Sequence, residues 1–149
     1  MGTVNIDYSE LQDYVKHLEK VDLESFCRDC AKELAARLLA KAIKRTPVGQ
    51  YPASSGKRGG TLRRGWTAGQ NAIEYAHALP VSHTGDVYTI EIINPVEYAP
   101  YVEYGHRTRN GGWVEGRFML TISEQEIQGK ARQILQNKIT KKLKEVFSE

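Results

Sequence analysis

A long helical repeat that ends at a proline constrains this chain most. Apolar residues recur at helical spacing from Leu23 to Ile43, and Asp22 stands where an N-cap is expected. The repeat stops at Thr46-Pro47, because proline has no amide hydrogen and pushes the residue before it out of helical geometry. A helix of this length spans roughly 35 Å. We therefore expect it to be the main core helix.

Two further helices are predicted, one at each end of the chain. Residues 6–21 place Tyr8, Leu11, Val15 and Leu18 at three-and-four spacing, which predicts a short amphipathic helix whose single apolar stripe is buried and which caps one end of the molecule. From about Arg117 the apolar residues follow the helical period again, almost to the last residue.

Strand signals lie between the two long helices. Residues 61–68 could form a short edge strand, residues 72–81 have a mixed pattern, and residues 86–94 alternate clearly between apolar and polar side chains. His83 to Asp86 supply the turn of a hairpin between the last two. These segments predict an antiparallel meander. The expected fold class is α+β, with long N-terminal and C-terminal helices packed on a small antiparallel sheet.

The length of 149 residues predicts a single domain, residues 1–149. Residues 48–60 are rich in glycine, serine and proline, so we expect a flexible basic loop with a function of its own. No apolar run approaches the roughly 18 residues of a membrane span, and the first residues lack a signal-peptide pattern. We expect no membrane partner and synthesis in the cytosol.

Charge is distributed unevenly along the chain. No Asp or Glu occurs between Leu34 and Ile73, a stretch that holds these eight basic residues: Arg37, Lys41, Lys44, Arg45, Lys57, Arg58, Arg63 and Arg64. Three interpretations of the basic loop stay open. It could be a solvated loop that aids solubility, a loop that becomes ordered against an acidic neighbour in an assembly, or a contact for nucleic-acid phosphates with Tyr51 and Trp66 stacking on bases.

Catalytic and metal-binding patterns are weak. None of the four histidines has a carboxylate at triad or ligand spacing nearby in the sequence. Cys27 and Cys30 have no second Cys or His pair at zinc-ligand spacing, so we interpret them as core or half-buried thiols. Gly59 to Arg64 lacks the Lys-Ser/Thr pair of a phosphate-binding P-loop. The sequence predicts neither an enzyme nor a metal or cofactor site.

A second motif contains tyrosines and a further basic loop. Tyr98, Tyr101 and Tyr104 recur every third residue after Asn94-Pro95, which predicts a short helical turn with aromatic rings on one face, before Gly105. The rings could simply be core. A basic loop from His106 to Gly112 follows, with Arg107 and Arg109. Because Glu97 and Glu103 lie beside the tyrosines, we expect them to face Arg-rich segments of another copy, so that charge reversal at Glu103 would weaken self-association.

Several segments together resemble one known family. They are AARLLAKAIKRTP at 35–47, GTLRRGW at 60–66, VEYAPYVEYGHRT at 96–108 and WVEGRFML at 113–120. They resemble the phage tail-component family typified by gene product ten of phage Hong Kong 97, over most of the chain from about Asp22. In many relatives the threonine-proline and glycine-threonine-leucine-arginine elements are close together, whereas residues 49–59 lengthen that link here.

The resemblance implies a structural subunit of the head-tail junction, or neck, of a tailed phage or prophage, acting in tail completion or head-tail joining. It implies a ring of copies in the virion, made in the bacterial host cytoplasm, and contacts with neighbouring head-completion and tail-terminator or tail-tube proteins. We expect the ring to form only on a template, so that the isolated subunit could be a monomer. DNA passing through the channel would be a secondary partner. No catalysis and no cofactor are implied. The alternative is a nucleic-acid-binding module that uses the basic Gly-rich loop.

The expected assembly residues come from both motifs and from the basic loops. The resemblance selects Arg63, Arg64 and Trp66, and then Tyr98, Tyr101, Glu103, Tyr104 and His106. The basic loops add Lys57, Arg58, Arg107 and Arg109. We expect the loop at 48–60 to become ordered only in the particle.

Overall fold

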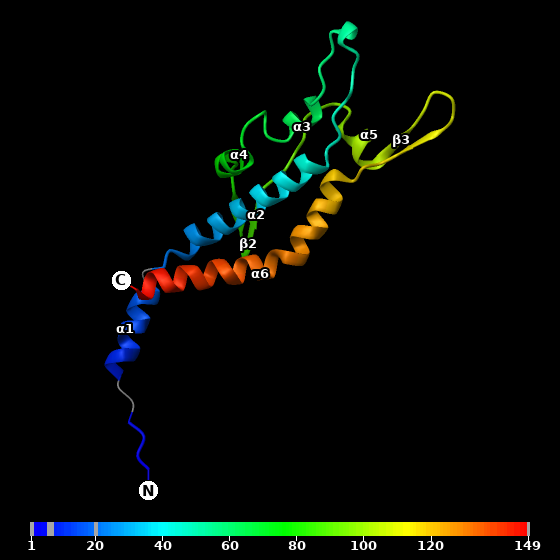
Figure 1. Cartoon of the computed structure of the whole chain (residues 1–149). Helices are drawn as coiled ribbons and strands as arrows, with labels where there is room; N and C mark the ends of the chain where they lie inside the picture. The colour runs from blue at the N-terminus through cyan, green and yellow to red at the C-terminus, as the bar shows by residue number, and fades with distance from the viewer. Residues whose placement is uncertain (1, 6–7, 20, 149) are drawn as a thin grey trace.

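The computed structural model describes residues 2–5, 8–19 and 21–148. Two long helices, α2 (Leu23–Arg45) and α6 (Met119–Phe147), lie side by side (Figure 1). α1 (Tyr8–Glu19) extends beyond one end of this pair. The loop at 48–60 and a hairpin of β3 (Gly105–Arg107) and β4 (Trp113–Glu115) extend beyond the other end. The α+β class is confirmed, with long helices and small antiparallel sheets.

α2 begins and ends where local chemistry predicts. The Asp22 side chain accepts a 3.0 Å hydrogen bond from the Ser25 amide, which caps the first turn. Thr46 has extended geometry (φ −74°, ψ 124°), as expected for a residue before proline. Between these ends the helix buries Leu39 and Ala42 completely.

Ion pairs join α2 to α6 in antiparallel orientation. Lys138 Nζ of α6 lies 2.9 Å from Glu33 Oε2 of α2. Nearer the other end of the pair, Glu126 of α6 accepts from Lys41 Nζ at 2.9 Å and from the Arg45 guanidinium. The two long helices are therefore clamped at two points along their length.

The predicted strands at 61–68 and 72–81 are wrong, because both segments are helical. α3 (Thr61–Gly65) places Leu62 in the core, and α4 (Ala72–Ala78) buries Ala76. The Asn71 side chain caps α4 by accepting from the amides of Ile73 (2.9 Å) and Glu74 (3.4 Å). Leu62 and Ala76 belong to the buried core, and Ala72 and Tyr75 pack against it, whereas Ile73 of α4 is exposed.

A hairpin does form around His83 to Asp86, but its first strand overlaps the predicted turn and does not lie at residues 72–81. β1 (Ser82–Thr84) pairs antiparallel with β2 (Val87–Thr89), and His83 lies opposite Tyr88. The strand expected at 86–94 is shorter than predicted, since residues 90–94 are irregular although Ile90 and Ile92 pack against the core. In the described residues the two hairpins form separate two-stranded sheets, so the meander was wrong.

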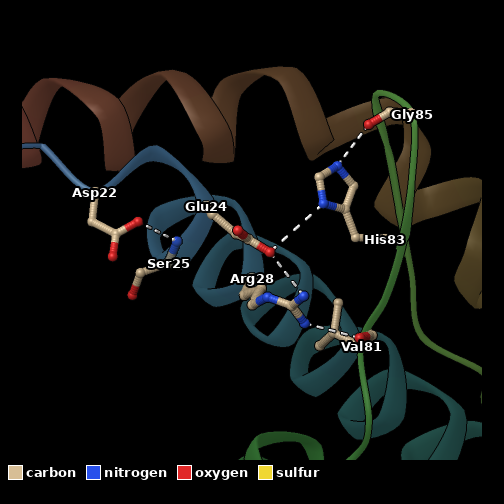
Figure 2. A network of polar contacts seen from close by, with 7 residues as sticks. All are labelled: Asp22, Glu24, Ser25, Arg28, Val81, His83 and Gly85. Atoms are coloured by element: carbon tan, nitrogen blue, oxygen red, sulfur yellow. Dashed lines mark hydrogen bonds and ion pairs between the residues drawn. The ribbon is translucent and has the colours of Figure 1, made fainter.

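Polar contacts fix the first hairpin on the start of α2 (Figure 2). Arg28 donates 2.9 Å from Nη1 to the Val81 carbonyl, while its Nη2 pairs with Glu24 Oε1 at 3.0 Å. The His83 ring points at the same carboxylate, with Nδ1 3.7 Å from Glu24 Oε1. It also stacks on Tyr88 at 4.0 Å between ring centroids. α2 thus has strand contacts at its N-terminal end as well as helix contacts.

α1 is helical as predicted over the described residues, but its apolar stripe is not buried. Tyr8, Leu11, Val15 and Leu18 are between 48% and 73% exposed. α1 instead contacts the end of α6, where the Tyr14 and His17 rings lie 5.5 and 5.6 Å from Phe147. Ile6, Asp7 and Lys20 of the predicted range lie outside the described residues. The stripe is exposed because α1 extends past the end of the helix pair.

Within the described chain, no helix combines the length and the apolar character that crossing a membrane requires.

Candidate assembly site

The two motifs singled out in the sequence meet at one end of the molecule. A pocket of about 230 Å³ lies between them, lined on one side by residues 47–49, Tyr51 and residues 58–62, and on the other by Tyr98 and Val102. α5 (Ala99–Tyr104) forms that second side. Small-molecule sites usually measure about 300–1,000 Å³, so this pocket is small for a ligand. We call the loop at 48–60, α5 and the β3–β4 hairpin together the loop end (Figure 1).

Thr46 anchors the segment that follows the loop. Its buried hydroxyl donates 2.6 Å to the Ala42 carbonyl and accepts 2.7 Å from Trp66 Nε1. Its carbonyl accepts 2.7 Å from Arg63 Nε. Both ends of the loop are therefore fixed to the end of α2.

These bonds place Trp66 in the core. The indole is only 3% exposed, so in this structure it cannot stack on a base or on a neighbouring subunit. The sequence interpretation that made Trp66 a surface aromatic is thus corrected, because a tryptophan whose N–H finds a buried partner packs inside. Arg63 likewise has one guanidinium nitrogen committed to Thr46.

The loop itself displays two basic side chains. Lys57 and Arg58 are exposed, and Lys57 Nζ lies 5.7 Å from the centroid of the Tyr51 ring. Arg64 folds back on the loop, donating to the Gly59 carbonyl at 3.2 Å and to Thr61 Oγ1 at 3.4 Å. The loop contains a short 3-10 turn, η1 (Ala53–Ser55). That it becomes ordered only on assembly stays a prediction.

The tyrosines of α5 form an exposed aromatic surface. The helical turn predicted here is confirmed, and the side chains of Tyr98, Tyr101 and Tyr104 are all exposed rather than core. His106 lies 5.8 Å from Tyr101 between ring centroids. Trp113 of β4 is also exposed. Aromatic side chains gathered on a surface in this way are typical of protein interfaces.

Glu103 is buried, unlike the exposed tyrosines beside it. It is 7% exposed, and its carboxylate accepts from the Leu120 amide at 2.7 Å (Oε1) and 3.3 Å (Oε2). Phe118, the residue before α6, supplies no side-chain cap. Glu103 therefore caps α6 from a distant element, where its negative charge also suits the positive end of the helix dipole.

This position corrects the expectation for Glu103. A carboxylate turned inward onto α6 does not face the Arg-rich surface of another copy, so charge reversal at Glu103 would act on the fold first.

The hairpin that follows was missed by sequence reasoning, which predicted only a basic loop. β3 and β4 pair with Gly105 opposite Glu115 and Arg107 opposite Trp113. Gly105 has φ +88°, and a Cβ there would lie 2.5 Å from the Val114 carbonyl oxygen. The turn residues between the strands were the sequence signal that could have predicted this hairpin. In the structure Thr108 Oγ1 accepts a 2.9 Å hydrogen bond from the Gly112 amide across that turn. The hairpin carries exposed Arg107 and Arg109 away from the body.

Groups that could bind a metal or act as nucleophiles are not gathered in the described residues. No cluster of three or more His, Cys, Asp or Glu there could hold a metal ion. Cys27 and Cys30 are free and half-buried. Burial raises the pKa of the Cys30 thiol, which leaves less of the thiolate that metal binding or redox chemistry uses.

A family model matches the chain. The family model described as "Bacteriophage HK97-gp10, putative tail-component" matches residues 9–105, well over half of the 149 residues. No curated protein and no solved structure matches the chain significantly. The matched range runs from the second residue of α1 through α5, with the loop and the exposed tyrosines, and the arginines of the β3–β4 hairpin follow it.

Proposed function

The chain belongs to the HK97-gp10-like family of bacteriophage tail components, and from that premise we propose that it is a structural subunit of the head-tail junction, or neck. In this proposal it acts in tail completion or head-tail joining in a tailed phage or prophage. Copies form a ring on the axis between the portal and the tail, after synthesis in the host cytoplasm. The subunit performs no catalysis and takes no cofactor.

The observation that carries the proposal is the loop end. A rigid helix pair presents exposed Tyr98, Tyr101, Tyr104 and Trp113 beside exposed arginines on one projecting end. Tyrosine, tryptophan and arginine are the residues most enriched at the energetic centres of protein interfaces. A neighbouring head-completion, tail-terminator or tail-tube protein is therefore a suitable partner for this end.

The shape of the molecule supports a joining role. α1 extends past one end of the α2–α6 pair and the loop end extends past the other, so two separate surfaces are free to bind different neighbours (Figure 1). Between these two surfaces, the ion pairs of Glu33 and Glu126 connect α2 to α6. This arrangement suits a spacer between two partners.

A second candidate, nucleic-acid binding, is favoured by the exposed cations of the loop end: Lys57, Arg58, Arg107 and Arg109. The buried Trp66 weakens it, because one of the two aromatics offered for base stacking is not on the surface. The two functions differ in their response to salt. Binding through phosphates weakens steeply as salt rises, whereas a contact through aromatic rings need not.

The proposed function is tested in the phage or prophage that carries the gene. Tyr101→Ala with Tyr104→Ala should leave the purified subunit folded, because both rings are exposed, and should cause unjoined heads and free tails to accumulate in lysates viewed by electron microscopy. Lys130→Ala with Arg132→Ala, at exposed positions of α6, is the control. Fully joined particles from the tyrosine variant would overturn the role of the loop end in joining.

A gel-shift with the purified wild-type subunit tests the second candidate. Tight binding to duplex DNA that is lost between about 50 and 200 mM salt, and is lost also in Arg107→Glu with Arg109→Glu, would favour nucleic-acid binding. Absence of a shift at low salt would exclude it.

A further inference from the structure

The apolar stripe of α1 has no cover in the isolated subunit. Tyr8, Leu11, Val15 and Leu18 are each about half exposed or more, on a helix whose other side is polar. Successive residues turn about 100° around a helix, so these four lie within an arc of roughly 80°. Tyr14 and His17, which contact Phe147, lie roughly 40° and 100° beyond the Leu18 edge of that arc. The contact with α6 therefore leaves the stripe open.

An apolar groove begins where the stripe ends. It is lined by Leu18 itself and, on the body of the molecule, by Val21, Leu23, Phe26, Ile139 and Leu143, with Lys142 as the one charged residue. Leu23 and Ile139 are well exposed. Because Leu18 belongs to both, stripe and groove form one continuous apolar surface. Surfaces of this kind on soluble proteins usually mark a binding site.

The groove cannot be filled by the stripe of its own chain. α1 is a continuous helix, and Tyr8 lies ten residues before Leu18, which at about 1.5 Å per residue carries it roughly 15 Å beyond the groove. Figure 1 shows α1 directed away from the α2–α6 pair. An amphipathic helix that fills the groove must therefore come from another molecule.

α1 and the α6 side of the groove carry opposite net charges. The described residues of α1 include Glu10, Asp13 and Glu19 against Lys16, a net charge of −3 + 1 = −2. The last seven residues of α6, 141–147, include Lys141, Lys142 and Lys144 against Glu145, a net charge of +3 − 1 = +2. An acidic amphipathic helix thus matches the basic α6 side of this apolar groove, while Asp22 and Glu24 flank Leu23 on the other side.

We propose that α1 of one copy docks its stripe into the groove of a second copy. The occupant is this chain's own N-terminal helix, exchanged between neighbours, with Leu11 and Val15 buried against Ile139 and Leu143 and the acidic side of α1 near the lysines of α6. Because donor and acceptor surfaces differ, the contact can propagate from copy to copy. It supplies the self-contact of the proposed ring and rests on the proposed function in that respect.

The test is the oligomeric state of the purified full-length protein, measured by sedimentation equilibrium over a range of concentrations. The arm variant is Leu11→Asp with Val15→Asp, and the groove variant is Ile139→Asp. All three side chains are about half exposed in the isolated subunit, so circular dichroism should show an unchanged fold. The matched control is Lys16→Glu, which changes the net charge by the same −2 as the arm variant but lies on the polar side of α1.

The wild type should self-associate reversibly, and the arm and groove variants should each raise the dissociation constant at least about tenfold, since two buried aliphatic contacts are lost or opposed. The control should stay within about twofold. Mixing arm and groove variants should give a heterodimer, because one supplies an intact groove and the other an intact α1. A monomeric wild type would overturn the proposal and would indicate that the stripe binds a different protein. Failure of the mixture to pair would also overturn it, and unchanged self-association of the groove variant would show that stripes bind each other instead.

These outcomes are separate from those of the proposed function. A monomeric wild type together with unjoined particles in the tyrosine variant would reject helix exchange alone. Normal self-association together with fully joined particles in that variant would reject the loop end's role in joining and leave helix exchange in place.

Discussion

Trp66 Nε1 donates a 2.7 Å hydrogen bond to Thr46 Oγ1, and this bond joins the end of α3, the helix after the basic loop, to the residue that ends α2. The same hydroxyl donates to the Ala42 carbonyl at 2.6 Å, so the buried Thr46 side chain is a donor and an acceptor at once. Both motifs around the loop, threonine-proline and glycine-threonine-leucine-arginine, depend on this contact for their relative position. The loop projects from the body of the molecule because both of its ends are fixed to the end of α2.

Thr46→Val should destabilise the fold by about 1–3 kcal/mol, because it keeps the shape but leaves the buried Trp66 N–H without an acceptor. Urea unfolding followed by tryptophan fluorescence measures the change in midpoint. Thr46→Ser is the control, since it keeps the hydroxyl and loses only a methyl group. An unchanged midpoint in Thr46→Val would show that the hydrogen bond to Trp66 does not stabilise this site.

Glu103→Lys should lower the thermal unfolding midpoint markedly, because it removes the cap of α6 and puts a positive charge at the positive end of the helix dipole. Glu103→Gln keeps an acceptor and should lose less. The matched control is Glu97→Lys, at an exposed position before α5. If Glu103→Lys unfolds at the wild-type temperature, the carboxylate does not support α6.

Stability should fall as the pH drops below about 4.5. Hydrogen bonds from Lys138 and then Arg37 lower the pKa of Glu33 from its ordinary value of 4.5, and those from Lys41 and then Arg45 lower the pKa of Glu126. Below 4.5 the unfolded chain takes up protons at these two groups before the folded chain does. Their contribution to stability is therefore complete above the unfolded value and is lost as the pH falls through the folded values.

The measurement is the urea midpoint between about pH 6 and pH 3. Glu33→Gln with Glu126→Gln should make this profile flatter than that of the wild type, with Glu10→Gln on α1 as the control. An acid slope in the double variant as steep as that of the wild type would mean that the two clamps between α2 and α6 do not contribute.

Two glycines should respond to alanine in opposite directions. A Cβ at Gly65 would lie 2.3 Å from Asn94 Oδ1 and 2.7 Å from Val96 Cγ2, so Gly65→Ala should destabilise the fold and weaken the bond from Asn94 to the Leu62 carbonyl. Gly129 lies in α6 with open space around its Cβ position, and Gly129→Ala should stabilise the fold by about 0.5–1 kcal/mol. Differential scanning calorimetry of both variants checks the signs, and two shifts of the same sign would contradict this account.

Local chemistry made part of the fold predictable. The ends of α2 follow from an aspartate that caps and a proline that cannot continue a helix, and both act within a few residues of the chain. The turn at Gly85 and Asp86 and the helical turn of the tyrosines were readable for the same reason. The short helices α3 and α4 were mistaken for strands, because segments of five and seven residues show too little of either period.

The candidate site was half predictable. The sequence placed the basic loop, the tyrosines and the arginines in motifs, but it could not tell that Trp66 and Glu103 point inward while the tyrosines beside Glu103 point outward. These directions depend on partners at distant positions, Thr46 for the indole and the Leu120 amide for the carboxylate. Spacing along one segment contains no information about such partners.

By itself the sequence determined the long helices, the α+β class and the motifs that resemble a tail-component family, because each follows from chemistry within a short stretch of chain. Only the tertiary structure decided which of those residues are available to a partner. The stripe of α1 shows the reason most directly. An apolar stripe at helical spacing looks the same in the sequence whether it covers the core of its own chain or binds another copy. Whether the stripe is buried depends on which other segments of the folded chain reach it.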